Sequence, residues 1–181
     1  LGELLRVCRL EENRGLGIAL REGVALCRNE YIARMDSDDV SLPHRCRQQL
    51  MFMEENALDV CSGAVAEFEE DPSHPLSGRA LPEGHDALRA FAKRRNPINH
   101  PAAMFRKTKV LEAGNYQSVP WFEDYDLWVR MFLAGARFGN LPQTLVNMRV
   151  SEASYRRRGG AAYCRACAFF WRRALDRGFI T

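Results

Sequence analysis

The sequence predicts an α/β sandwich in which helices cover both faces of a largely parallel sheet. Strand-like and helix-like segments alternate along the 181 residues, which is the pattern of that fold class. A composition of 46% hydrophobic and 27% charged residues is typical of one globular domain with its own core. The apolar runs are only a few residues long, which excludes a membrane-spanning helix within this sequence.

The first quarter of the chain is expected to form two strands, each followed by a helix. A short strand over residues 4–10 precedes an amphipathic helix over 13–29, where apolar residues recur at helical spacing. A second strand over 31–35 ends at a run of aspartates. The next helix is expected to begin after Ser41, a good N-cap residue, with Pro43 in its first turn.

The rest of the chain continues this alternation up to a final helix. The expected elements are a strand over 59–68, a loop over 71–84, a helix over 85–94, a strand over 102–106, a helix over 107–116, a helix over 121–138, a strand over 144–150 and a helix from about residue 161. Gly114 and Gly135 stand where the 107–116 and 121–138 helices should end, which is typical of helix C-termini.

Basic residues are concentrated near the end of the sequence. The net charge is only +3, but residues 149–177 contain eight arginines and two acidic residues. Such a segment could contact an anionic membrane surface, or its arginine stems could simply solvate a surface helix; nucleic acid is not an expected partner. Six cysteines without zinc-site spacing favour a reducing compartment, so we expect a cytoplasmic protein at or near the inner face of the membrane.

Three carboxylates, those of Asp36, Asp38 and Asp39, crowd into the turn after the 31–35 strand. Ligands bind α/β sheets at the carboxyl ends of strands, so this turn is a candidate site. A hard divalent cation is commonly held by one or two carboxylates together with substrate phosphates. The same acids could also be simple partners of a helix dipole, with no metal involved.

A second acidic cluster, Glu123 and Asp124, opens the 121–138 helix directly after Trp121 and Phe122. A carboxylate beside apolar side chains can have its pKa raised toward the range of a general base. First-turn acids are, however, often only dipole partners. On the same helix, Asp126 and the residue four positions later, Arg130, are spaced to form an ion pair.

Five segments occur along the chain in a specific order: ENRGLGIALREGV, YIARMDSDD followed by P-x-R, NHPAAMFRK, GNY and EDYDLWVRM-x-x-x-G. In this order they resemble the family 2 glycosyltransferases of bacterial polysaccharide biosynthesis, over roughly residues 6–158. The resemblance implies a GT-A fold, which is a Rossmann-like αβα sandwich with a mixed, mostly parallel sheet. It also implies metal-dependent, inverting hexosyl transfer from a nucleotide sugar, such as a UDP- or dTDP-sugar, to a glycan or a lipid-linked acceptor.

On the donor side, the resemblance matches D-S-D-D to the family's D-x-D motif. It implies that Asp38 contacts the donor or its metal, with Asp36 or Asp39 completing the site. Asp38 and Asp39 are then the expected ligands of Mg²⁺ or Mn²⁺, and Asp36 is an expected donor contact. Asn13 and Arg14 match a stretch that lines the nucleotide pocket.

On the acceptor side, the resemblance matches Asp124 to the family's general base, which takes the proton from the acceptor hydroxyl. It implies that Glu123 helps to orient the acceptor. His100 and Trp121 are the expected lining of the acceptor site, although a polar turn histidine with no such role is the alternative for His100.

The family's first two strands, which supply most of the base and ribose pocket, have no counterpart in this sequence. The resemblance therefore implies an N-terminally truncated GT-A domain over residues 1–158 that lacks its first βα units, followed by an amphipathic helix over 159–181. We expect such a fragment to bind the donor poorly and to be slow or inactive when alone.

Two other functions are compatible with the sequence. A degenerate transferase fragment could act as an interaction module through its arginine-rich end. The segment DSDDV also matches the D-x-D-x-V motif of haloacid-dehalogenase-like phosphatases. That family needs a lysine ahead of a second acidic pair, however, and Lys93, Lys107 and Lys109 do not fit this pattern.

Overall fold

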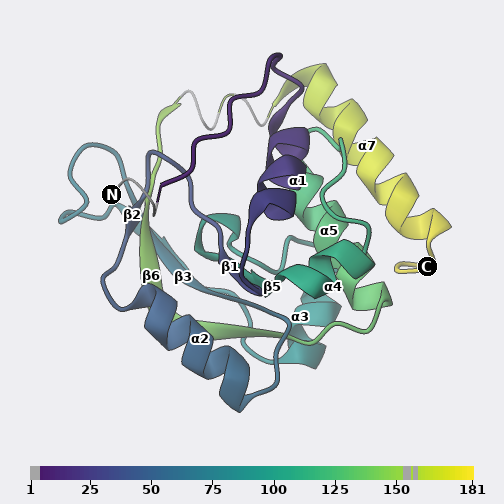
Figure 1. The fold of residues 1–181 in the computed structure, drawn as a ribbon. Coiled ribbons are helices and arrows are strands. Elements are labelled where there is room, and N and C mark those ends of the chain that lie inside the picture. The colour runs from purple at the N-terminus through teal and green to yellow at the C-terminus, as the bar shows by residue number, and fades with distance from the viewer. Residues whose placement is uncertain (1–4, 153–155, 157–158) are drawn as a thin grey trace.

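The computed structural model describes residues 5–152, 156 and 159–181 of the chain. Its helices are α1 (Leu16–Leu26), α2 (Arg45–Glu55), α3 (His85–Phe91), the 3-10 turn η1 (His100–Ala102), α4 (Lys107–Glu112), α5 (Glu123–Leu133) and α7 (Gly160–Asp176). Its strands are β1 (Tyr31–Ala33), β2 (Val40–Ser41), β3 (Val60–Phe68), β4 (Ser77–Arg79), β5 (Met104–Arg106) and β6 (Phe138–Arg149). Figure 1 shows these elements as one α/β domain, which confirms the predicted class.

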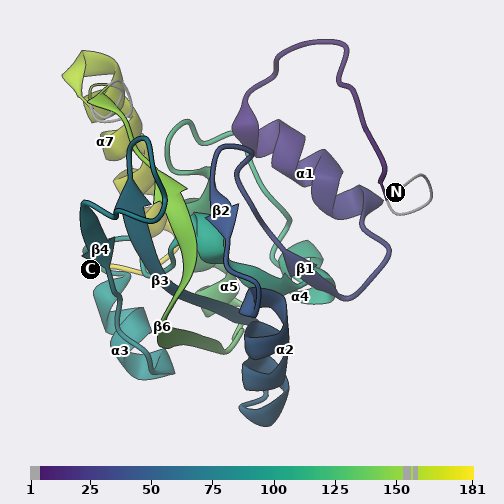
Figure 2. The same ribbon diagram turned by 90° about the vertical axis from the view of Figure 1, so that its left-hand side faces the viewer.

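The described strands form one sheet in the order β1-β5-β3-β6-β2, and β4 pairs with β3 beside that path. The two longest strands, β3 and β6, run parallel and make the centre of the sheet (Figure 2). A register shift interrupts this pairing next to Gly63. A Cβ atom at Gly63 would lie 2.5 Å from the side chain of Leu145, so the close approach of the two strands requires glycine there.

The sheet is mixed, as predicted, but the expectation of mostly parallel pairing is wrong for the described strands. Four of the five pairings, β1–β5, β2–β6, β3–β4 and β3–β5, are antiparallel. The connection from β3 to β4 is too short for the crossover that a parallel pair needs, so the chain returns as a hairpin. Alternation of strands and helices therefore predicted the layers correctly, but it carried no information on the direction of the short strands.

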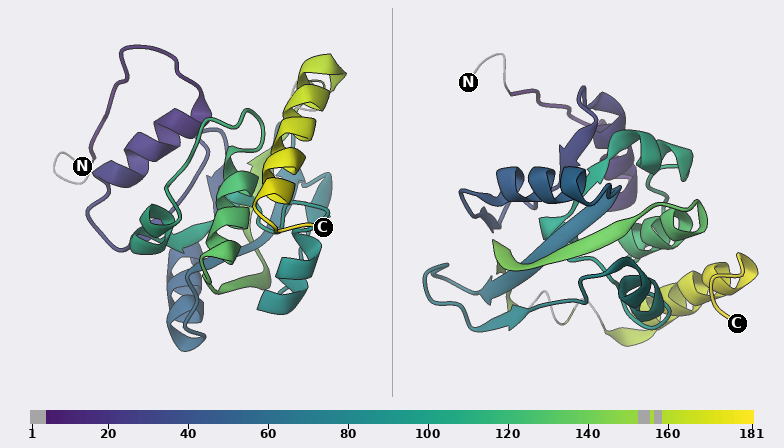
Figure 3. Two further views of the ribbon diagram at one scale, coloured as in Figure 1. Left: turned by 90° about the vertical axis from the view of Figure 1, so that its right-hand side faces the viewer. Right: turned by 90° about the horizontal axis from the view of Figure 1, so that it is seen from below.

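Helices cover the two faces of the sheet unequally. One face carries α2, whereas α3, α5 and α7 lie on the other, with α7 outermost (Figure 3). Neighbouring residues of β3 show the alternation that produces these layers. Val60 joins the core under α5, and Cys61 joins the smaller core under α2.

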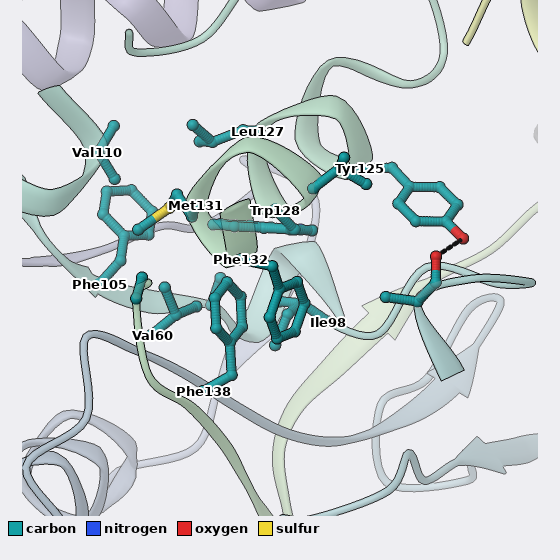
Figure 4. Close-up of a cluster of buried hydrophobic side chains, with 14 of the residues drawn as sticks. Val60, Ile98, Phe105, Val110, Tyr125, Leu127, Trp128, Met131, Phe132 and Phe138 are labelled. Carbon is teal, nitrogen blue, oxygen red and sulfur yellow. Dashed lines mark hydrogen bonds between the residues drawn. The ribbon is translucent and has the colours of Figure 1, made fainter. Parts of the chain in front are cut away.

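Helix α5 is buried on all sides between the sheet and α7. Figure 4 shows Trp128 and Phe132 packed against strand side chains; the Phe132 ring stacks on Phe138 with 3.8 Å between centroids. The Tyr125 hydroxyl donates a hydrogen bond to the carbonyl of Ala92 at 2.8 Å. Burying one such large apolar side chain is worth about 1.5–3 kcal/mol, so this cluster holds the first turn of α5 firmly in place.

Helix α7 packs on the outer side of α5 through aromatic rings. The Phe170 ring lies 4.3 Å from that of Tyr125 and stacks on Phe122 at 5.1 Å, centroid to centroid. Both Phe170 and Phe179 are buried in the main core. The final predicted helix is confirmed, and none of the described helices has the length and apolar character needed to cross a membrane.

Several local predictions need correction. Residues 5–10 form no strand, and Leu5 and Val7 are exposed, because no described strand lies beside them to pair with their backbone; Leu4 lies outside the described residues. Ser41 is not a helix N-cap. It pairs with Val146 in the β2–β6 ladder, and α2 begins four residues later. The predicted 71–84 loop contains β4, and the predicted 144–150 strand begins earlier, at Phe138.

Candidate active site

The first turn of α5 presents Glu123 and Asp124 at one end of the buried helix. Asp124 is only 8% exposed. Its Oδ2 atom accepts a hydrogen bond from Asn96 Nδ2 at 2.7 Å, and its Oδ1 atom accepts one from the Tyr125 backbone N–H at 2.8 Å. The Nδ1 atom of His100 lies 3.8 Å from Oδ2. The structure thus holds one carboxylate oxygen of Asp124 between an amide and an imidazole.

Burial changes the protonation of both acids. It raises the pKa of Asp124, and the Asn96 hydrogen bond offsets only part of this effect. Burial, followed by the neighbouring charge of Asp124, raises the pKa of Glu123 to about 7. A carboxylate with a pKa near neutral pH, such as Glu123, can accept and release protons under physiological conditions, and a raised pKa makes Asp124 a stronger base than an ordinary aspartate.

His100 forms the wall of the site behind Asp124. Its Nε2 atom lies 2.9 Å from the Tyr116 hydroxyl, and its ring meets Trp128 edge-on at 6.1 Å between centroids. Burial holds the pKa of His100 well below its ordinary value, so the imidazole is neutral at pH 7. A neutral His100 leaves Asp124 without a cationic partner at this position.

The acidic turn after β1 contains three carboxylates in different environments. Asp36 forms a bidentate ion pair with Arg34, with both N–O distances 2.5 Å. Asp39 Oδ1 accepts a hydrogen bond from the Arg149 backbone N–H at 2.8 Å, whereas its Oδ2 atom is buried and finds no partner among the described residues. Burial, with smaller effects from Asp36 and Asp38, raises the pKa of Asp39 to about 6.

These properties fit a cation held by Asp38 and Asp39. Asp38 is exposed, and Asp39 has a buried carboxylate oxygen that lacks a donor. In the part of the chain that is described, no group of three or more His, Cys, Asp or Glu side chains could hold a metal by itself. This donor set suits Mg²⁺ or Mn²⁺, which commonly take one or two carboxylates and complete their coordination with phosphate oxygens and water.

The two acidic clusters lie within electrostatic reach of each other. After burial and the charge of Asp124, the charge of Asp36 contributes to raising the pKa of Glu123 across the gap between β1 and α5. The start of α1 closes on the same region. A Cβ atom at Gly17 would lie 2.5 Å from the carbonyl oxygen of Gln117 and 3.3 Å from the Glu123 Cβ. Any larger residue at Gly17 would therefore push α1 away from the first turn of α5.

Of the residues expected to contact the donor, Asn13, Arg14 and Asp36, only Asp36 interacts with the acidic pair of α5. Asn13 Oδ1 accepts the Gly15 backbone N–H at 3.1 Å, so its side chain stabilises the turn that precedes α1. Arg14 is exposed and forms no ion pair with another described residue. Asp36, in contrast, lies within electrostatic reach of Glu123.

Trp121 lies next to the acidic pair in an unusual conformation. Its φ is +63°, in the left-handed region that bulky residues rarely adopt. The side chain is 46% exposed, and its ring meets Tyr163 of α7 edge-on at 6.0 Å between centroids. Such strain is often retained at functional sites, and here it occurs two residues before Glu123.

Sequence reasoning missed two residues of this site. Arg34 stands two positions before Asp36, a spacing that places both side chains on the same side of an extended chain. Asn96 comes directly before Pro97 in a turn that carried no recognisable motif. The spacing of Arg34 was a usable signal, whereas the contact between Asn96 and Asp124 depends on how the loop after α3 folds back.

The arginines near the end of the chain have internal partners. The predicted Asp126–Arg130 pair is confirmed, with a distance of 2.8 Å, and Arg173 and Arg177 also bind Asp126 at 2.9 and 2.7 Å. Arg149 donates to the carbonyl of Glu69 at 2.6 Å. Arg157 and Arg158 lie outside the described residues. The outward face of α7 keeps two of the arginines, Arg165 and Arg172, with the exposed side chains of Phe169 and Leu175.

The chain is similar in sequence to bacterial glycosyltransferases. The family model described as "Glycosyl transferase family 2" matches residues 1–114. The chain is 38% identical over 180 residues to the amylovoran biosynthesis glycosyltransferase AmsE of Erwinia amylovora, covering 97% of this chain and 67% of that protein. It is 37% identical over 155 residues to the Escherichia coli UDP-Gal:alpha-D-GlcNAc-diphosphoundecaprenol beta-1,3-galactosyltransferase, covering 85% and 56% of the two chains.

The fold is also that of a solved glycosyltransferase. The crystal structure of S. aureus TarS 1–349 in complex with UDP-GlcNAc matches with a TM-score of 0.66 and 15% identity, covering 91% of this chain and 48% of TarS. The chain thus spans between about half and two thirds of the length of these proteins. By its sequence and its partial GT-A fold, the chain belongs to glycosyl transferase family 2, together with enzymes of bacterial polysaccharide biosynthesis.

Proposed function

We propose that the full-length protein transfers a sugar from a nucleotide-diphosphate donor to a hydroxyl of a glycan or lipid-linked acceptor, with inversion. The observation that carries this proposal is the buried Asp124, which has a raised pKa and lies in one site with an acidic turn that is short of positive charge. The names of the relatives support a UDP-sugar donor and a diphosphoundecaprenol-linked acceptor.

The acidic turn is proposed to bind the donor diphosphate. Asp38 and Asp39 would hold Mg²⁺ or Mn²⁺, and Asp36, Asn13 and Arg14 would contact the donor. When bound, the metal would neutralise the negative charge that develops on the leaving diphosphate. The buried Oδ2 atom of Asp39, which accepts no hydrogen bond from any described residue, supports this assignment.

Asp124 is proposed to act as the general base. It would take the proton of the acceptor hydroxyl while the new C–O bond forms on the face of the sugar opposite the departing diphosphate, which inverts the anomeric centre. Glu123 would orient the acceptor. His100 would support the geometry of Asp124 from behind, and the exposed ring of Trp121 would offer a flat apolar surface to an acceptor sugar.

The C-terminal part is proposed to bring the catalytic site to a membrane-bound acceptor. In this proposal, residues 1–158 are part of the catalytic domain and residues 159–181 form an amphipathic helix. Arg165 and Arg172 with Phe169 on the outward face of α7 would make a peripheral contact with anionic lipid. The proposed location is the cytoplasmic face of the membrane.

The direct test is sugar transfer by the full-length protein and its Asp124→Asn variant, with donors screened as UDP- and dTDP-sugars. Loss of a general base should lower kcat by roughly 10²–10⁴-fold. Donor binding, measured by calorimetry with Mn²⁺, should stay within about twofold of wild type, because Asp124 lies on the acceptor side. A matched control is Asp86→Asn, which changes an exposed first-turn aspartate of α3. Equal losses of transfer and donor binding would identify Asp124 as a structural carboxylate and reject the proposal.

A further inference from the structure

We propose that Arg34 is a positioning residue for this transfer reaction: its guanidinium orients Asp36 and is the countercharge shared between the acidic turn and Asp124. The part of this inference that concerns catalysis rests on the proposed function of Asp124. The placement of Arg34 is independent of it.

The position of Arg34 is constrained at its backbone and at its guanidinium. Its N–H donates to the Ala103 carbonyl at 2.9 Å, and its carbonyl accepts from Arg45 Nη2 at 2.6 Å. The side chain is 7% exposed and ends in the bidentate pair with Asp36. A planar guanidinium held in this way fixes the orientation of the carboxylate it binds.

The charges around Arg34 are strongly unbalanced. The groups that interact with its charge are Asp36 and Asp39 from the acidic turn, Glu123 and Asp124 from α5, the neutral His100 of η1, the Tyr116 hydroxyl from the segment after α4, and a second guanidinium, that of Arg45 in α2. Hydrogen bonds bring Arg34 and Asp124 to the same region: Ala103, which accepts the Arg34 N–H, donates its own N–H to the His100 carbonyl at 3.1 Å, and His100 Nδ1 lies 3.8 Å from Asp124 Oδ2. Burial is the largest influence on Glu123 and Asp124 and raises their pKa values, whereas the positive charge of Arg34 lowers both. Arg34 therefore acts on carboxyls of both acidic clusters.

Arg34 also has an unused donor. Its Nε–H is buried and has no acceptor among the described residues. A buried N–H without a partner is destabilising, so its retention indicates a role in ligand binding more than in folding. An anionic oxygen of a bound nucleotide sugar is the kind of acceptor to which this N–H would donate a hydrogen bond.

A neighbouring arginine shows what a structural guanidinium looks like in the same region. Arg45 is 2% exposed and donates to the Gln49 side chain and to the carbonyls of Arg34 and Ala103. These oxygen acceptors are all neutral, so Arg45 ties β1 and α2 together without binding a carboxylate. Arg34 differs because its two hydrogen-bonded partners are both oxygens of a carboxylate.

The experiment compares Arg34→Gln, which removes the charge, with Arg34→Lys, which keeps the charge but not the bidentate geometry. The matched control is Arg106→Gln. Arg106 also pairs with a carboxylate beside β1, that of Glu30 at 3.4 Å, but it lies opposite Tyr31 at the other end of the strand. The first readout is the titration of the Asp124 carboxyl by ¹³C NMR in the full-length protein, with the resonance assigned by its loss in Asp124→Asn. The second readout is the pH profile of kcat.

In Arg34→Gln, the Asp124 titration midpoint should rise by about one pH unit, because a nearby positive charge that favoured the ionised form has been removed. The acidic limb of the kcat profile should move by the same amount, and Arg106→Gln should leave both unchanged. In Arg34→Lys, the titration midpoint of Asp124 should stay close to that of wild type. The KM for the donor should rise several-fold, because an ammonium group orients Asp36 less well than a bidentate guanidinium.

If the titration midpoint of Asp124 is unchanged in a folded Arg34→Gln protein, Arg34 is not the countercharge of Asp124. If that variant does not fold, an Arg34→Lys protein with a wild-type donor KM overturns the role in orienting Asp36. A shifted midpoint in a protein that transfers no sugar would support the electrostatic link and reject the proposed function, so the two failures are distinguishable.

Discussion

Asp124 and Asp126 stand two residues apart on α5, and both are buried, yet their surroundings are opposite. Asp126 is 1% exposed and accepts hydrogen bonds from Arg130, Arg173 and Arg177. Among the described residues, no arginine donates a hydrogen bond to Asp124, which receives its side-chain hydrogen bond from Asn96. Burial would raise the pKa of Asp126, but hydrogen bonds from the three guanidiniums outweigh it and lower the pKa, whereas the pKa of Asp124 is raised.

This difference separates a carboxylate that stabilises the fold from one available for chemistry. The arginines around Asp126 join α5 to α7, and Arg173 also donates to Gln117 in the segment before α5, at 2.6 Å. They fix the helix whose first turn carries Asp124. A fully compensated carboxylate has no capacity left for a ligand or a proton, while an under-compensated one has both.

The comparison is tested most strongly by the stability of matched Asp→Asn variants. Asp126→Asn should lower the free energy of unfolding by about 3 kcal/mol, because it leaves three arginines around a neutral side chain. Asp124→Asn should be neutral or slightly stabilising at pH 7.5, since it removes a buried charge to which no described guanidinium donates a hydrogen bond. Urea unfolding of both variants measures this, and equal destabilisation would show that the two aspartates do not differ in role.

A second test uses pH. The folded pKa of Glu123, about 7, exceeds its ordinary value of 4.5, so its ionisation destabilises the fold increasingly as pH rises between these two values. Glu123→Gln should therefore gain stability relative to wild type, by a few degrees in Tm, between pH 5 and pH 8. The Tm difference between Asp126→Asn and wild type should stay constant over that range. That Tm difference should shrink only when the pH falls below 3.8, the ordinary pKa of an aspartate, because the folded protein holds the pKa of Asp126 below that value.

Taking the difference in Tm between each variant and wild type cancels the contributions of the titrating groups that both proteins share. His100 in particular acts in the opposite direction, because its depressed pKa costs stability as pH falls below 6.5. A Glu123→Gln difference that is the same at pH 5 and pH 8 would show that Glu123 has an ordinary pKa.

The smallest effect is expected within α7. Arg177→Gln removes one of the three guanidiniums on Asp126, and it should cost about 1 kcal/mol because Arg177 is partly exposed and two donors remain. Arg165→Gln changes an exposed arginine of the same helix and should leave the unfolding free energy unaltered. If vesicles of anionic lipid bind the Arg165 variant more weakly than the Arg177 variant, the outward face of α7 is the membrane contact. The reverse order would assign that contact elsewhere.

The predictable parts of this molecule are those with a local signal. Helix α5 was predicted from its apolar spacing, and the Asp126–Arg130 pair from a separation of four residues. The contacts from Arg173 and Arg177 to the same aspartate cross 47 and 51 residues, and no periodicity encodes them. The predicted N-cap at Ser41 failed because that residue pairs with β6, more than 100 residues away.

The sequence by itself determined the α/β class, the family and the two acidic segments, because spacing along the chain and the order of motifs are local properties. Only the tertiary structure decided the directions of the strands, the three arginine contacts of Asp126 and the burial of Asp124 beside an amide instead of a guanidinium. The physical reason is that burial and charge balance depend on which distant segments meet. In this protein, the meeting of β1, η1 and α5 leaves Arg34 as the shared countercharge of the candidate site.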